Sequence, residues 1–209
     1  MSTGLTRRRW LSRINWFLGN SSSIEQDAAE AVQLLETLPP GPNLAMAYSN
    51  RSHLLMLASK NDEAVRWGER AIELAESLGD NETLAYALNN AGAALLDVRD
   101  ERGSAYLERS LHMALARGWE EHASRAYTNL ACCALNNHNY ALAEPFFHKG
   151  LAYCSEHDLD SFDIYLRSWL ARSLFEQGHW DEAAEEATRV LNHYRLSPAA
   201  KIPALTILG

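Results

Sequence analysis

The sequence predicts an all-α solenoid of about five antiparallel helix pairs. A four-residue pattern that opens a helix returns at regular spacing, as Ala47-Tyr48-Ser49-Asn50, Ala87-Leu88-Asn89-Asn90 and Ala126-Tyr127-Thr128-Asn129. A small residue marks the same point in each copy, and members of this series lie 39 or 40 residues apart: Ser12, Ser52, Gly92, Ala131 and Ala171. Self-similarity at such a period is the signature of stacked helical repeats.

The recurring small residues have a packing explanation. Two antiparallel helices joined by a short turn pack closely only where the side chains at their crossing are small, and a bulky residue there would cost about 1–3 kcal/mol. A second series of small residues lies twelve residues after the first, at Ala64, Ser104, Ala143 and Ala183. Its member in the first repeat is the exception, because Ile24 stands there. Each repeat is therefore expected to hold two helices that touch at these positions.

Composition and charge exclude several classes of function. The 209 residues are 47% hydrophobic, which suffices for a core, and the formal net charge of −8 disfavours nucleic acid as the direct partner of this segment. No run approaches the length of apolar residues that a membrane-spanning helix needs, so no membrane association is expected. The odd set of Cys132, Cys133 and Cys154 is a poor disulfide framework and predicts a reducing, cytoplasmic location.

Helix stop signals divide the chain into repeats within a single domain, 1–209. The cluster Pro39-Pro40-Gly41-Pro42 ends the first repeat, and Gly79 is expected to end the second in a left-handed conformation. The predicted repeats are 5–41, 42–79, 80–118, 119–159 and 160–197, followed by a partial repeat, 198–209. Neither end shows a polar capping helix, so the chain reads as a segment of a longer array; alternatively it is complete and its ends fray or dimerise.

These motifs resemble the tetratricopeptide repeat family. The first helix of that family carries aromatic-x-Asn-Leu-Gly and the second carries small residues seven apart, and this chain has Tyr127-Thr128-Asn129-Leu130-Ala131 followed by Ala143 and Gly150. Tyr48-Ser49-Asn50, followed by Ala64 and Ala71, matches in the same way, although Arg51 stands where leucine is usual. The unit of about 40 residues exceeds the usual 34 and looks like the helical-repeat region of large ATP-dependent bacterial regulators of the LuxR type.

The resemblance implies a right-handed superhelix whose concave groove binds a protein or peptide. In the family, the asparagine of the first helix looks into the groove and hydrogen-bonds a peptide backbone, a task that suits an amide because it both donates and accepts. Asn50, Asn90 and Asn129 hold this position in three successive repeats. The alternative is that these asparagines cap or brace neighbouring helices.

The same register predicts the other groove residues. They are Arg13, His53, Tyr86, Asn89, Arg125, Tyr165 and Arg172, together with Arg9, Trp16, Ser49, Met56, Thr128, Cys132 and Ser168. Arg125 lies one turn before Asn129 and is expected to pair with a carboxylate of the partner. A solvated arginine, or a bridge to a nearby glutamate, is the alternative.

The predicted function is a protein- or peptide-binding scaffold or sensor, implied by the resemblance to belong to a bacterial signalling or transcription regulator. No Gly-x-x-x-x-Gly-Lys-Ser/Thr, no His-Glu-x-x-His and no Cys/His pair at zinc spacing occurs, so no cofactor, metal or catalytic residue is nominated. An array that senses a small effector and, less favoured, an enzyme with the groove as its active site are the alternatives. Self-association through uncapped ends is a further expectation.

Overall fold

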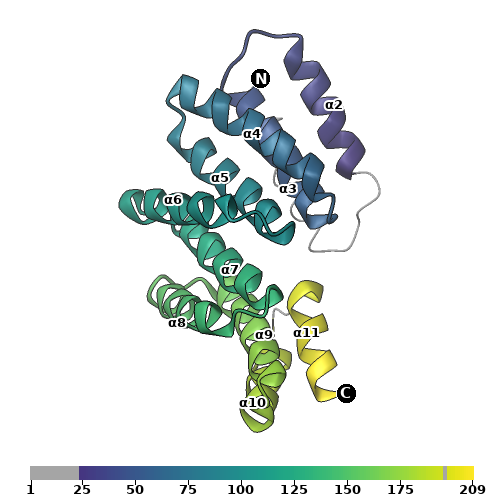
Figure 1. The fold of residues 1–209 in the computed structure, drawn as a ribbon, viewed down its shortest axis with the longest axis vertical. Coiled ribbons are helices and arrows are strands. Elements are labelled where there is room, and N and C mark those ends of the chain that lie inside the picture. Colours follow the sequence, from purple (N-terminus) through teal and green to yellow (C-terminus); the bar gives the residue numbers. More distant parts are fainter. Residues whose placement is uncertain (1–23, 195–196) are drawn as a thin grey trace. The chain divides into compact units, whose positions relative to one another are not determined.

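The described part of the chain has helices as its regular elements, as the sequence predicts. The computed structural model describes residues 24–194 and 197–209, which form ten α-helices and no strand (Figure 1). These are α2 (Ile24–Glu36), α3 (Pro42–Leu57), α4 (Asn61–Leu78), α5 (Asn81–Asp97), α6 (Arg102–Arg117), α7 (Glu120–Asn136), α8 (Tyr140–Glu156), α9 (Asp160–Glu176), α10 (Trp180–Leu191) and α11 (Pro198–Leu208). The helix expected around Trp10, which would carry Arg13, lies outside the described residues.

The chain divides into two compact units, Met1–Ala123 and Ser124–Gly209, and the division falls within α7. In the first unit, each helix from α2 to α6 packs against the next, and α3 also packs against α5. Val32, Leu44, Ala71 and Leu88 belong to one buried cluster of this unit. In the second unit α9 packs against α8, α10 and α11, so both units show the neighbour-to-neighbour packing of helical repeats.

The small residues lie where the two helices of a repeat cross. Ser52 on α3 is fully buried and its hydroxyl donates a 2.7 Å hydrogen bond to the carbonyl oxygen of Ala64 on α4. In the next repeat, a Cβ atom added at Gly92 of α5 would come within 2.9 Å of the carbonyl oxygen of Gly103 on α6. Ala131 and Ala143 are fully buried in one cluster of the second unit. The packing explanation of the small-residue series is therefore confirmed at these crossings.

The turns repeat as regularly as the helices. The turn inside each described helix pair places one residue at positive φ, namely Ser59 (57°), Arg99 (61°), His138 (55°) and Gly178 (83°). The turn between repeats does the same at Gly79 (67°), Gly118 (64°) and Asp158 (55°). The left-handed end expected at Gly79 is confirmed, and members of each series lie 39 or 40 residues apart.

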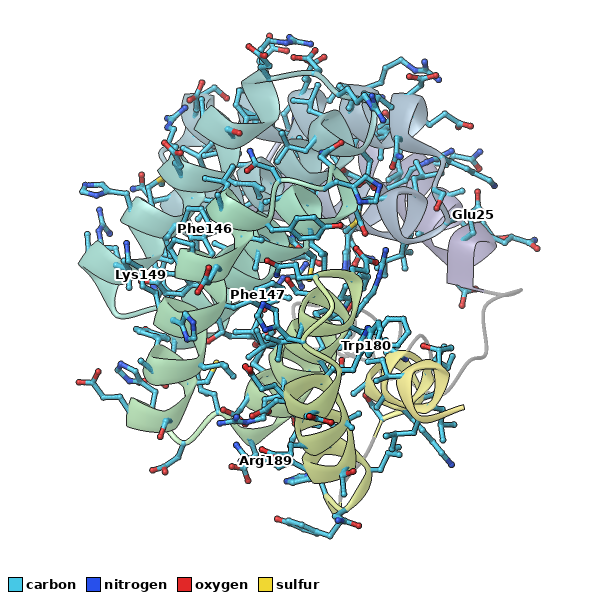
Figure 2. All side chains as sticks on the ribbon, turned by 60° about the horizontal axis from the view of Figure 1, so that its bottom comes forward. Glu25, Phe146, Phe147, Lys149, Trp180 and Arg189 are labelled. Carbon is cyan, nitrogen blue, oxygen red and sulfur yellow. The ribbon has the colours of Figure 1, made fainter. Side chains whose placement is uncertain are left out.

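Helix α8 buries one face, whereas residues 83–95 of α5 are buried on all sides of the helix. Phe147 on α8 is fully buried, whereas its neighbour Phe146 is partly exposed; both are labelled in Figure 2. Exposed large apolar side chains also occur, and Trp180, at the start of α10, is 69% exposed. The described surface is therefore not uniformly polar.

Candidate functional site

In the first unit, the first helices α3 and α5 are joined by polar contacts at the predicted groove positions. Asn90 is fully buried, and its Nδ2 donates to the backbone carbonyl and the hydroxyl oxygen of Ser49, both at 3.2 Å. A buried amide satisfied in this way braces two helices. Asn90 thus takes the bracing role that the sequence left open as the alternative.

His53 and Tyr86 form a second contact between α3 and α5. The Tyr86 hydroxyl lies 2.9 Å from His53 Nδ1, and both side chains are buried, as is that of Asn89. The Tyr86 ring also lies edge-on to the ring of His122 in the first turn of α7, with centroids 5.8 Å apart. The structure therefore brings His53 and Tyr86 into one buried contact between α3 and α5.

Asn50 differs from Asn90 although it holds the same position of its repeat. It is partly exposed, and its Oδ1 has no hydrogen-bond partner among the described residues. An unpaired acceptor is unfavourable, because a lost hydrogen bond to water is not replaced. Asn50 Oδ1 is therefore a buried acceptor that no described residue satisfies.

In the second unit, the corresponding helices are α7 and α9, and Arg172 connects them. Its Nη1 donates to Asn136 Oδ1 at 3.2 Å, and its Nε donates to Glu176 Oε1 at 2.7 Å. The same guanidinium lies over the Trp169 ring, 5.2 Å from its centroid. These contacts hold Arg172 in one orientation while leaving it partly exposed.

Tyr165 lies on the same face of α9, near α7. Burial raises the pKa of the Tyr165 phenol well above its ordinary value, the nearby Cys132 raises it further, and the charge of Arg125 lowers it by less. The phenol is consequently neutral at physiological pH and can donate a hydrogen bond. Arg125 itself is 9% exposed, and Asn129, one turn further along α7, is partly exposed.

Sequence reasoning missed part of this second-unit face. Trp169 lies four residues after Tyr165 and three before Arg172, with the Tyr165 and Trp169 ring centroids 6.3 Å apart. This spacing places all three side chains on one side of α9, so helical periodicity alone could have identified the tryptophan. Asn136 and Glu176 hold the guanidinium of Arg172 in place. A single sequence does not indicate which of several polar residues makes such contacts.

No group of three or more histidine, cysteine, aspartate or glutamate side chains is arranged to hold a metal ion within residues 24–194 and 197–209. Over the same residues, no helix combines the length and the apolar character needed to cross a bilayer.

Comparison with known proteins identifies the fold. No protein-family model and no curated protein sequence matches the chain. Among solved structures, a Rap protein complexed with Competence and Sporulation Factor superposes with a TM-score of 0.79 at 15% identity, over 95% of this chain and 54% of that one. BtubC from P. vanneervenii gives a TM-score of 0.65 at 17% identity, over 88% of this chain and 80% of that one.

A third match is a signal transduction ATPase with a tetratricopeptide repeat sensor from Pyrococcus horikoshii. It gives a TM-score of 0.65 at 18% identity, over 95% of this chain and 32% of that one. The chain thus spans about half the length of the Rap structure and about a third of the ATPase. At these identities the likeness concerns the fold alone, and the fold is that of tetratricopeptide-like helical repeats.

Proposed function

We propose that the chain binds an extended protein or peptide segment on the face that α7 and α9 form in the second unit, as a scaffold or sensor module of a bacterial signalling or transcription regulator. The observation that carries the proposal is the partly exposed polar row on α7 and α9, formed by Asn129, Tyr165 and Arg172. An amide, a neutral phenol and a guanidinium together offer the donors and acceptors that a peptide backbone and its carboxylates require.

The structural neighbours support this proposal. The Rap protein is complexed with Competence and Sporulation Factor, and the ATPase uses its tetratricopeptide repeats as a sensor. A sensor can respond to a small molecule as well as to a protein, so the ATPase is also compatible with the small-effector alternative. The thiols of Cys132, Cys133 and Cys154 are buried and form no disulfide, which favours a reducing, cytoplasmic setting.

The test uses a peptide selected from a displayed random library against the full chain. We expect Asn129→Ala and Arg172→Ala each to weaken binding about tenfold, because each leaves a polar group of the bound peptide unpaired. Glu73→Ala, at an exposed position of α4, is the control and should leave the affinity unchanged. Affinity is measured by fluorescence polarisation.

A parallel stability measurement separates binding from bracing. Asn90→Ala should lower the free energy of unfolding by about 1–3 kcal/mol, because it leaves the buried Ser49 carbonyl without its donor. Asn129→Ala should leave the urea midpoint nearly unchanged. If Asn129→Ala instead destabilises the fold and spares the affinity, the row on α7 is bracing and the proposed binding face is wrong.

We also propose that the chain self-associates weakly through α11. Ala200 and Ala204 of this helix are buried, whereas Ile202, Leu205 and Leu208 are between 45% and 63% exposed. Apolar side chains grouped on a helix favour association because burial removes them from water. The double substitution Ile202→Glu with Leu205→Glu should raise the dissociation constant about tenfold or more in sedimentation equilibrium. Lys201→Glu is the control, and a monomer at every concentration of the unaltered chain would contradict the idea.

A further inference from the structure

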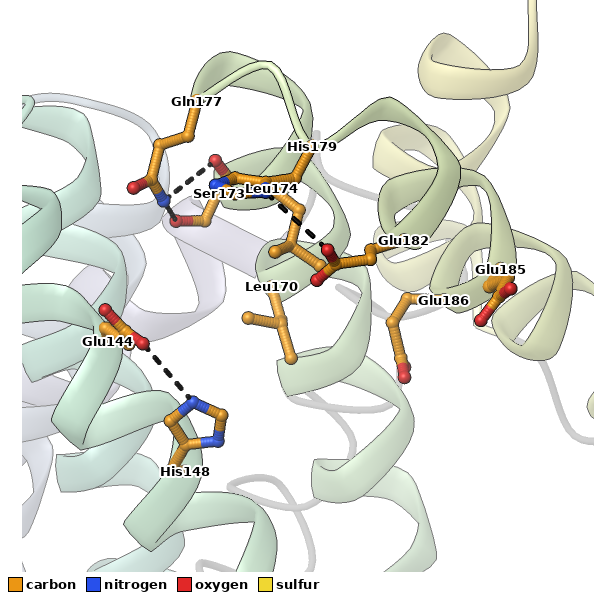
Figure 3. A pocket seen from close by; sticks show the side chains of 10 residues that line it. All are labelled: Glu144, His148, Leu170, Ser173, Leu174, Gln177, His179, Glu182, Glu185 and Glu186. Atoms are coloured by element: carbon orange, nitrogen blue, oxygen red, sulfur yellow. Dashed lines mark hydrogen bonds and ion pairs between the residues drawn. The ribbon is translucent and has the colours of Figure 1, made fainter.

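The second unit contains a pocket of about 390 Å³ on the side of the second helices α8 and α10 (Figure 3). Its lining residues come from α8, α9, the following turn and α10: Glu144, His148, Leu170, Ser173, Leu174, Gln177, His179, Glu182, Glu185 and Glu186. Figure 3 shows Glu144 and His148 on one side of Leu170, and Glu185 and Glu186 on the other. The pocket therefore has two carboxylate-bearing walls and an aliphatic floor.

The glutamates of this pocket differ in how far nearby basic side chains compensate their negative charge. Glu186 pairs with Arg167 at 3.1 Å and with Arg189 at 3.0 Å, and neither arginine lines the pocket. Among the described residues, Glu144 and Glu182 pair with imidazoles, at 3.8 Å from His148 and 3.6 Å from His179 respectively.

Glu185 forms no ion pair with any described residue. The ten described lining residues include four glutamates and neither lysine nor arginine. The pocket is therefore negative on both walls and complementary to a cation.

We propose that this pocket binds a linear aliphatic polyamine, with ammonium groups on the carboxylates of both walls and methylene groups on Leu170 and Leu174. The volume lies within the range of small-molecule sites, roughly 300–1,000 Å³. Two features of the pocket favour this chemistry over other cations. A metal ion would leave the leucine floor unused, and a monoamine would reach the carboxylates of a single wall.

The proposal does not depend on the peptide-binding function. The polar row proposed for peptide binding lies on the first helices α7 and α9, whereas the walls of the pocket come from the second helices α8 and α10. Leu170 and Leu174 of α9 contribute its floor. A polyamine site here would add a small-molecule input to a helical-repeat module.

The test titrates spermidine into the full chain by isothermal calorimetry at low ionic strength, where charge interactions are least screened. Glu144→Gln removes one charge from the α8 wall and Glu185→Gln removes one from the α10 wall. Each change should weaken spermidine binding about two- to fivefold, the range of an exposed ion pair. The double variant should lose about the product of the two effects.

Matched controls come from the same two helices. Glu156→Gln on α8 and Asp181→Asn on α10 remove the same charge at exposed positions outside the pocket. Both should bind spermidine like the unaltered chain. Equal weakening by these controls would mean diffuse attraction to a chain of net charge −8 and would overturn the site.

The ligand side is tested with n-butylamine and with Mg²⁺. Both should bind more weakly than spermidine. Equal affinity for spermidine and butylamine would overturn the two-wall geometry. No detectable spermidine binding at millimolar concentration would overturn the proposal as a whole.

Discussion

Replacing Phe147 by alanine is expected to lower the free energy of unfolding by about 3–5 kcal/mol. The side chain is fully buried on α8 and packs in one cluster with Leu135 of α7 and Leu166 of α9. The substitution removes an aromatic ring from the centre of the second unit, and the surrounding helices cannot fully collapse onto the cavity. Urea denaturation followed by circular dichroism measures the effect.

Phe146 provides a matched control for this experiment. It precedes Phe147 on the same helix but is partly exposed, so Phe146→Ala should cost clearly less. Similar losses for both variants would mean that α8 presents a different face to the core than the structure shows. A loss confined to Phe147→Ala would support the orientation of α8.

Substituting leucine at Gly92 is the second change with a large expected effect, a loss of about 3 kcal/mol. A Cβ atom at this position would lie 2.9 Å from the Gly103 carbonyl oxygen and 3.0 Å from atoms of Leu107 and Tyr106. The nearest of these atoms belongs to the backbone of α6, so it cannot move aside as a flexible side chain would. The α5–α6 crossing would have to open, and the urea midpoint should fall.

The control for Gly92→Leu is Ala105→Leu on the outer face of α6. Ala105 is exposed, so the larger side chain meets no packed neighbour there and stability should change little. An unchanged midpoint for Gly92→Leu would show that the two helices do not cross at this residue, and that the small-residue series has another cause.

The sequence predicted the helix pairs and their crossings because both depend on local, periodic features. Ser52 and Gly92 stand one repeat apart, and the structure places each at a helix crossing. Binding residues are less predictable, since their surroundings depend on contacts that are distant in sequence. Asn50 and Asn90 hold the same position of their repeats. The side-chain amide of Asn90 donates to Ser49, 41 residues away, whereas the side-chain oxygen of Asn50 has no hydrogen-bond partner among the described residues.

The acidic pocket was missed for the same reason. Glu182, Glu185 and Glu186 resemble a solvated helix face when α10 is considered alone. They become the wall of a pocket once Glu144 of α8 and Leu170 of α9 are placed nearby. A charge pattern along one helix carries no information about the helix that packs beside it.

The recurring left-handed turns make the stability of this chain adjustable at sites outside its buried core. A residue with a Cβ atom in this conformation costs roughly 1–2 kcal/mol relative to the right-handed region, and glycine avoids that cost. Repeat five has Gly178 where earlier repeats have Ser59, Arg99 and His138. Single substitutions at these turns can therefore raise or lower the stability of one repeat at a time. Because each turn affects one repeat, the sequence of such an array can change at its turns while the positions of its helices stay the same.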